Sequence, residues 1–261
     1  MPSGMQGNML SFQSASIFVT LMIMTLGNPS LSSSSRECTS VKPVFWEDSR
    51  EQFNWLGRIR YTRSVGGVLY PCSGVAITRR HVLVPAHCVL FLDMGDAYSF
   101  MVGNRRHAVS RIFIHPEYRL ELTSYDVAIL KLNSQLRSCL SVSEDTDSDA
   151  LIARLLDVVS SVVNKHPKNL HTLAKVTGHK YCQEKYGDFK LSHNEVCAYI
   201  HQDKDFLNGA ALLGVKVVNG SEAWRLLGIS THGPYERNPK IPELFTLLSS
   251  HNKWIANILS L

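Results

Sequence analysis

The chain contains no Cys-x-x-Cys pair and no His-x-x-x-His pair, although it has six cysteines and eleven histidines. Zinc sites commonly use such spacings, so their absence argues against a metal centre. The chain also lacks a large excess of either charge, because it has 27 Lys and Arg and 22 Asp and Glu. No nucleic-acid-binding motif accompanies the net charge of +5. We therefore expect no metal, no cofactor and no nucleic-acid partner.

No apolar run near the N-terminus is long enough to cross a bilayer. The run from Ile17 to Leu26 has ten residues and is followed by small polar residues, including Ser32 to Ser35. This pattern predicts a secretory signal peptide over residues 1–32, cut between Ser30 and Ser35. A membrane anchor is the alternative, which the shortness of the run disfavours. No Lys or Arg precedes the run, which departs from the usual basic start.

The rest of the chain has the composition of a globular domain. Hydrophobic residues make up 44% and charged residues 19% of the sequence. About 230 residues remain beyond the leader, enough for one domain with a full core and too few for a second cysteine-rich domain.

Apolar periodicity predicts strands over most of the chain. Val75 to Thr78, a turn at Arg79-Arg80, and Val82 to Val84 form a predicted hairpin, and Asp126 to Leu132 alternates like a half-buried strand. Near the C-terminus, apolar residues at helical spacing predict a helix; these are Trp254, Ile255, Ile258 and Leu259. From Ala150 to Val163 the spacing suits a helix while the valines suit a strand, and both readings stay open.

Five motifs in one order carry a resemblance to a known family. They are Cys72-Ser73-Gly74, Ala86-His87-Cys88, His115-Pro116-Glu117-Tyr118, the run Tyr125 to Leu132, and the pair Cys182 and Cys197. Together they resemble the chymotrypsin/trypsin family of secreted serine proteases, over roughly Gln52 to Leu261.

The resemblance implies an all-β fold of two packed six-stranded antiparallel β-barrels with a C-terminal helix. It also implies three disulfides and leaves no free thiol: Cys72 with Cys88, Cys182 with Cys197, and Cys38 with Cys139. Residues 33–54 would then be an N-terminal segment tethered by Cys38, and residues 55–261 the protease-homologous domain. Such crosslinks suit an oxidising extracellular setting.

Two parts of the family's catalytic triad are matched by residue type. His87 stands at the position of the base and Asp126 at that of the acid that orients it. Thr231 retains a hydroxyl where the family has a serine that supports the aspartate. We interpret these residues as a retained polar network rather than a working site, because the nucleophile is missing.

The segment that supplies the family's nucleophile reads Phe206-Leu207-Asn208-Gly209-Ala210-Ala211. Aligning Gly209 with the glycine after the serine places Asn208 at the serine, and an amide cannot form an acyl-enzyme. Leu207 falls at the aspartate that pairs with the new N-terminus on activation. Phe206 falls at the oxyanion-hole glycine, where a Cβ disfavours the turn.

The activation site and the specificity pocket also depart from the family. Val41-Lys42-Pro43-Val44 occupies the place of the activation cleavage and offers no comparable new N-terminus. Gln202 stands at the pocket floor, although an alignment shifted by one residue would place Asp203 there. Glu243 replaces a wall glycine, the pocket cysteine pair is missing, with Lys204 at one of its positions, and no Val-Thr-Gly-Trp-Gly string occurs.

The remaining surfaces suggest binding. The family docks extended peptides by β-addition at the strand matched by Ser230 to Gly233. Asn219-Gly220-Ser221 is both a hairpin turn signal and an N-glycosylation sequon. Clustered cations predict a basic face for acidic proteins or sulfated glycans, and an ordinary solvated surface is the alternative; they are Arg58, Arg60, Arg63, Arg79, Arg80, Arg105, Arg106 and His107.

The sequence thus predicts a secreted, inactive serine protease homologue that acts by binding. Its expected partners are extracellular proteins, namely active proteases or their substrates, for which it would serve as cofactor, decoy or scaffold in a proteolytic cascade such as arthropod-style immunity. One alternative is an active endopeptidase with a displaced nucleophile such as Ser221 or Ser230. Another is a protein that binds sulfated glycans or surfaces.

Overall fold

The computed structural model describes residues 38, 41–42, 53–63, 66–90, 97–120, 123–144, 151, 155–162, 168–187, 190–201, 206–232 and 241–261. All of them belong to one compact unit, Ser32–Leu261. The predicted signal peptide lies outside the described residues. In the part of the chain that is described, no helix has the length and apolar character needed to cross a membrane.

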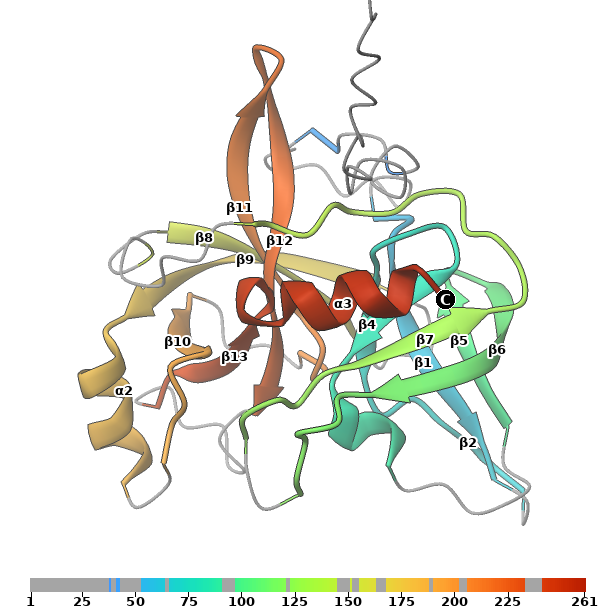
Figure 1. Cartoon of the computed structure of the whole chain (residues 1–261), viewed down its shortest axis with the longest axis horizontal. Helices are drawn as coiled ribbons and strands as arrows, with labels where there is room; N and C mark the ends of the chain where they lie inside the picture. The colour runs from blue at the N-terminus through green and yellow to red at the C-terminus, as the bar shows by residue number, and fades with distance from the viewer. Residues whose placement is uncertain are drawn as a thin grey trace, which may run out of the picture. The chain divides into compact units, whose positions relative to one another are not determined.

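The first half of the domain is a closed β-barrel (Figure 1). Its six strands are all antiparallel to their neighbours, and pairing of the first strand with the last closes the ring. A short seventh strand, β2 (Val68–Leu69), extends the sheet beside β1. In ring order the six are β1 (Leu56–Thr62), β3 (Ser73–Ala76), β4 (His81–Val84), β7 (Ala128–Leu132), β6 (Arg105–Ile114) and β5 (Ala97–Val102).

The second half is another closed antiparallel barrel of six strands. In ring order these are β10 (Glu195–Ile200), β13 (Glu243–Leu247), β12 (Ser221–His232), β11 (Ala211–Val218), β8 (Leu155–Val162) and β9 (Lys168–Thr177). The helical elements among the described residues are η1 (Ala86–Val89), α2 (His179–Tyr186), η3 (Leu248–His251) and α3 (Asn252–Leu259). The predicted double barrel with a closing helix is confirmed.

Strand β7 corrects one sequence expectation. It begins at Ala128 rather than Asp126, and every residue except Lys131 is buried. The half-buried alternation predicted here is wrong, because successive residues that point to opposite faces of β7, such as Ile129 and Leu130, are both buried. Ile129 and Leu130 are fully buried members of the main hydrophobic cluster, which also contains Ile255 of α3. The predicted β3–β4 hairpin is confirmed by the pairing of Val75 with Leu83.

The segment that suited either helix or strand is a strand. Leu155–Val162 forms β8, which pairs along its whole length with β9 and over three residues with β11. Val158 and Val159 are fully buried. Their branched side chains pack well on a pleated surface, and two neighbouring strands satisfy the backbone, which outweighs the helical spacing.

All six cysteines form the bridges that the resemblance implies: Cys38–Cys139, Cys72–Cys88 and Cys182–Cys197. Close to Cys38, the carbonyl oxygen of Val41 accepts a hydrogen bond of 2.9 Å from the backbone N–H of Trp224. The N-terminal segment is therefore attached to both barrels, since Cys139 follows the first barrel and Trp224 lies in β12.

The β11–β12 hairpin extends well beyond its barrel (Figure 1). Val218 pairs with Ser221, so the loop has two residues, Asn219 at φ 51° and Gly220 at φ 75°. Two positive φ values define the turn type that Asn-Gly favours. The predicted turn is confirmed, and the sequon Asn219-Gly220-Ser221 is exposed at its tip.

Candidate active site

The structure brings His87 and Asp126 together at one end of the first barrel. His87 lies in η1, just after β4, and Asp126 lies two residues before β7. These strands are neighbours, with Val84 opposite Ala128. His87 Nδ1 donates to Asp126 Oδ2 at 2.6 Å, and the backbone N–H of His87 donates to Oδ1 at 2.9 Å. Both carboxylate oxygens are thus occupied by His87, which holds the imidazole in one orientation.

The other imidazole nitrogen meets Asn208. With Nδ1 carrying the proton, Nε2 accepts a hydrogen bond of 3.1 Å from the Asn208 side-chain N–H. The backbone of Asn208 is held in place because its main-chain carbonyl accepts a hydrogen bond of 2.7 Å from the backbone N–H of Ser73. Gly209 follows at φ +86°, and a Cβ there would overlap the Ser73 carbonyl oxygen. Close approach and positive φ explain why this position is glycine.

The residues before Asn208 are held by the second barrel. The N–H of Leu207 donates to Ser160 Oγ at 3.2 Å, and the Ser160 hydroxyl is 3.3 Å from the Leu207 carbonyl oxygen. Phe206 is half-buried and packs against the core of that barrel. Among the described non-glycine residues, positive φ occurs only at Tyr125 and Asn219, so Phe206 does not adopt the left-handed conformation.

Thr231 does not support Asp126 as expected. Its side chain is fully buried, yet Oγ1 has no hydrogen-bond partner in the described part of the chain. The preceding residue, Ser230, instead stabilises the loop after Asn208. Its backbone N–H and C=O bond to Ala210 and Gly209, and its hydroxyl accepts from the N–H of Ala210 at 3.0 Å. Ser230 is therefore unavailable for the β-addition expected over Ser230 to Gly233.

The predicted pocket positions are described only in part. Gln202, Asp203, Lys204 and Gly233 lie outside the described residues. Glu243 begins β13 opposite Ala198 and is partly exposed. Burial, followed by the nearby Glu243 and Glu195 carboxylates, raises the pKa of Tyr186.

Neither alternative nucleophile is placed to react with His87. Ser221 begins β12 and pairs with Val218, the last residue of β11, so the length of β11 at about 3.3 Å per residue puts it roughly 20 Å away from the Asn208 loop. Ser230 is only 5% exposed, and its hydroxyl already accepts a hydrogen bond from the N–H of Ala210.

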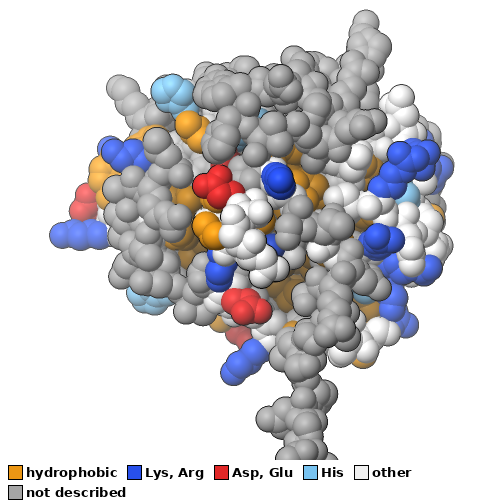
Figure 2. Space-filling view, turned by 90° about the horizontal axis from the view of Figure 1, so that it is seen from above, with side chains coloured by type: hydrophobic (Ala, Val, Ile, Leu, Met, Phe, Trp, Pro, Cys, Tyr) orange, Lys and Arg blue, Asp and Glu red, His pale blue; other side chains and the backbone are white. Residues whose placement is uncertain are grey.

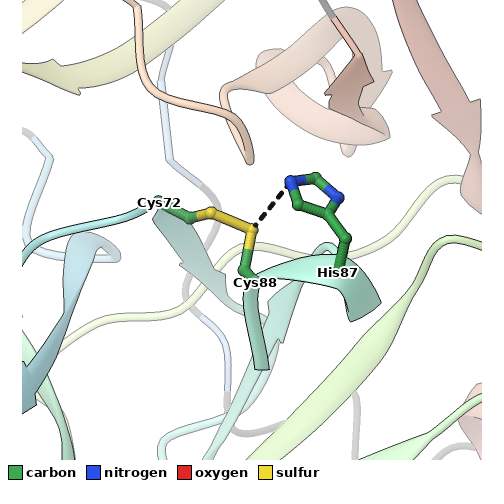
Figure 3. Close-up of side chains that lie close together, drawn as sticks. All are labelled: Cys72, His87 and Cys88. Atoms are coloured by element: carbon green, nitrogen blue, oxygen red, sulfur yellow. Dashed lines mark hydrogen bonds between the residues drawn. A yellow bond between two sulfur atoms is a disulfide. The ribbon is translucent and has the colours of Figure 1, made fainter. Parts of the chain in front are cut away.

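Cys72, His87 and Cys88 are the one group of potential metal ligands found among the described residues, with ligand atoms within 4.8 Å of one another (Figure 3). However, the two sulfurs are joined in a disulfide. Because metals bind thiolates rather than disulfides, this group is not a metal site.

Sequence reasoning missed a second histidine–aspartate pair. His171 of β9 contacts Asp157 of β8, with Nε2 and Oδ1 at 2.7 Å, and the indole N–H of Trp224 donates to Asp157 Oδ2 at 3.1 Å. A signal was present, since Asp157 is the one charged residue in the apolar run Leu155-Leu156-Asp157-Val158-Val159. A lone carboxylate in a buried strand requires partners.

A buried histidine cluster was also missed. The His251 ring lies 5.1 Å from that of His115 and 5.6 Å from that of Tyr125, and the side-chain N–H of Asn194 donates to its Nε2 at 3.4 Å. His251 is 2% exposed. Burial, with a smaller contribution from His115, lowers the pKa of His251 to about 4.

The basic face is only partly as predicted. Arg58 is 6% exposed, and its guanidinium stacks 4.5 Å from the centre of the Tyr70 ring. Burial lowers its pKa, with nearby Tyr70 opposing the shift. Arg60 donates to Thr62 Oγ1 at 2.6 Å. The expectation that Arg58 contributes to an exposed face is wrong, because its side chain is buried against the Tyr70 ring.

Two antiparallel six-stranded barrels, with a histidine and an aspartate meeting a loop that precedes β11, define the chymotrypsin-like class of proteins. The Trypsin family model matches residues 46–255, and the chain belongs to this family.

Relatives of the chain include proteases from distant animals. It is 22% identical over 241 residues to CLIP domain-containing serine protease B9 of Anopheles gambiae, covering 78% of this chain and 60% of that protein's length. It is 25% identical over 214 residues to snake venom serine protease Dav-X of Deinagkistrodon acutus, covering 73% and 78%.

Solved structures share the fold. A scabies mite inactivated protease paralogue has a TM-score of 0.66 at 21% identity, covering 82% of this chain and 99% of the other. Kallikrein-related peptidase 10, in a complex with Zn2+, has a TM-score of 0.62 at 20% identity, covering 81% and 98%.

Proposed function

We propose that this protein is a secreted, non-catalytic member of the trypsin family that acts by binding other extracellular proteins. The observation that carries the proposal is the contact of the Asn208 amide with His87 Nε2, 3.1 Å apart. In a working site this nitrogen accepts the proton of a nucleophilic hydroxyl. Here its lone pair is used by an N–H group that offers no nucleophile.

The surroundings of Asn208 support the same proposal. Leu207 carries no charge to pair with a new N-terminus. The Leu207 backbone is instead held by Ser160, an arrangement that requires no activation cleavage. A scabies mite protein described as an inactivated protease paralogue has the same fold, which supports a non-catalytic role for this fold here.

The proposed partners are active proteases or their substrates, for which the protein would serve as cofactor, decoy or scaffold in a cascade. Secretion is supported by the leader pattern and by three disulfides. We also propose an N-linked glycan on Asn219, because the sequon is exposed at a hairpin tip. Glycosidase treatment should increase gel mobility of the wild type and leave Asn219→Gln unchanged.

The test of catalysis is labelling by a fluorophosphonate probe, before and after limited trypsin cleavage. Trypsin itself serves as the positive control, and His87→Ala as the matched variant. We expect no labelling of the wild type in either state. Labelling that disappears in His87→Ala would overturn the proposal and establish an active hydrolase.

The Asn208→Ser variant measures how much else has been lost. We expect its labelling to stay at least a hundredfold below that of trypsin, because loss of oxyanion stabilisation alone costs about 10²–10³ in rate. Labelling within tenfold of trypsin would show that the nucleophile is the only missing part of the site.

A further inference from the structure

The positive charge of this protein is concentrated in the first barrel and is mostly arginine. Residues 53–144 contain ten Arg, one Lys and six Asp or Glu. Residues 145–261 contain three Arg, ten Lys and twelve Asp or Glu. Between residues 52 and 116 the only acids are Asp93 and Asp96. The net charge of the chain thus resides in one half of it.

Three chain segments bring much of this arginine to one end of the barrel. The turn before β4 bonds to the segment after β7, since the Arg80 and Arg79 carbonyls accept from the N–H groups of Leu132 at 2.8 Å and Leu136 at 2.7 Å. That segment also bonds to β6, with Asn133 donating to the Ala108 carbonyl at 3.0 Å. The segments therefore form one continuous surface.

We call this surface the arginine face; its cations are Arg79, Arg80, Arg105, Arg106, Arg111, Lys131 and Arg137. All are exposed except Lys131, which is partly exposed. Both ion pairs among the described residues join a histidine to an aspartate, so no carboxylate neutralises this face within the part described. Figure 2 shows Lys and Arg side chains gathered over this half of the molecule, at the right of the view.

Two features show that the like charges lie close together. Arg111 and Lys131 are directly opposite each other on β6 and β7. Like charges in that arrangement destabilise a sheet. In addition, the pKa of His107 is lowered, first by burial and then by the nearby charge of Arg105. An anion bound here would relieve both repulsions.

The guanidinium groups are suited to a particular kind of anion. Guanidinium is weakly hydrated and binds sulfate, phosphate or carboxylate through two parallel hydrogen bonds, which an ammonium cannot do. The Arg111 guanidinium lies 5.6 Å from the centre of the Phe113 ring, which restricts its orientation. From Arg105 to Arg111 the strand extends roughly 20 Å, so the three arginines of β6 are spread along its length.

A protein partner fits this face less well. Tight protein interfaces need a buried apolar or aromatic anchor. Of the exposed large apolar residues in the described ranges, only Ile114, at the far end of β6, lies on these segments. A row of exposed guanidinium groups without an apolar anchor matches a linear polyanion.

We propose that the arginine face binds a linear sulfated polysaccharide. The face lies at the opposite end of β4 and β7 from His87 and Asp126, because Arg80 and Lys131 stand at one end of these strands and Val84 and Ala128 at the other. Binding there is independent of catalysis and goes beyond the proposed function. A surface glycan would hold the protein where its partners act.

The test uses heparin as the sulfated probe and measures Kd at several NaCl concentrations. The Arg106→Gln/Arg111→Gln variant removes two charges from the face, and Lys180→Gln/Lys190→Gln removes two exposed charges from the second barrel. We expect the first variant to bind roughly tenfold or more weakly. The slope of log K against log salt should fall by about two. The control variant should change Kd by less than about twofold.

Two further arms test the chemistry of the ligand. Heparin should raise the Tm of the wild type and affect the arginine variant much less. Without heparin, the arginine variant should unfold at or slightly above the wild-type Tm, because it removes the Arg111–Lys131 repulsion, and the lysine variant should unfold at the wild-type Tm. Desulfated heparin should not bind. Equal losses in the two double variants, or equal binding of polyglutamate or duplex DNA at the same charge concentration, would overturn the proposal.

Discussion

The two histidine–aspartate pairs of this protein have nearly the same distance and exposure, but they differ in the residue that each pair meets next. His87 and Asp126 lie 2.6 Å apart with side chains 25% and 5% exposed, and His171 and Asp157 lie 2.7 Å apart at 22% and 7%. The first pair lies beyond the ends of two strands, where its free nitrogen meets the loop of Asn208. The second lies within a sheet, against the aromatic wall of Phe53 and Trp224.

The comparison shows that a buried carboxylate beside a histidine is not itself a catalytic feature. In both pairs the two carboxylate oxygens are fully used, either by His87 alone or by His171 together with Trp224. Each pair is a satisfied polar network inside a barrel protein. What distinguishes a triad is a nucleophile at the remaining imidazole nitrogen, and at that nitrogen of His87 the described residues place the amide of Asn208.

Replacing each aspartate by alanine should give the largest difference in stability between the two pairs. We expect Asp157→Ala to lower the free energy of unfolding by about 3 kcal/mol, because it leaves the N–H of the fully buried Trp224 without an acceptor. Asp126→Ala should cost about 2 kcal/mol, since both groups it leaves without an acceptor belong to His87, whose side chain is 25% exposed and can be reached by water. Urea unfolding measures both. A larger loss for Asp126→Ala would show that the first pair is the structural one.

A histidine without a carboxylate should respond to pH. The pKa of His251 in the folded state, about 4, lies below the ordinary value of 6.5, so the unfolded chain binds more protons between those pH values. The stabilisation is complete above about pH 6.5 and is lost as the pH falls. From pH 7 to 5 the wild type should lose about 2 kcal/mol more than His251→Gln. Parallel curves for the two proteins would contradict this.

Removing one N–H donor from each pair gives a finer comparison. Trp224→Phe keeps an aromatic ring but removes the donor to Asp157, and should cost about 1 kcal/mol in a fully buried site. Trp224 packs against Phe53 and Trp55, so the near-UV spectrum should confirm that the ring stays in place.

Asn208→Ala removes the donor to His87 and should have the smallest effect. Because Asn208 is partly exposed, water can replace its amide, and we expect a loss of less than about 0.5 kcal/mol. Thermal unfolding of the wild type and the variant measures it. A loss equal to that of Trp224→Phe would remove the distinction between a pair that meets a partly exposed amide and a pair that meets a fully buried indole.

Sequence patterns gave the elements that depend on neighbouring residues. The Asn219-Gly220 turn and the closing helix were predicted correctly because turn chemistry and helical spacing are local. The disulfide pairing and the double barrel came from a family resemblance, not from spacing. The sequence did not decide whether Leu155–Val162 is a helix or a strand, because its valines favour a strand and its apolar spacing favours a helix. Pairing with β9 and β11 makes it a strand.

The sequence by itself determined that no serine precedes Gly209 and that Leu207 replaces an aspartate, since these are facts of residue identity. It also determined where arginine is abundant. Only the tertiary structure decided that Asn208 bonds to His87, that Asp157 joins His171 and Trp224, and that Arg58 is buried while Arg111 and Lys131 stand side by side. The reason is that these contacts arise from strand pairing within a barrel or from packing between the two barrels, and no local pattern encodes which side chains then face each other.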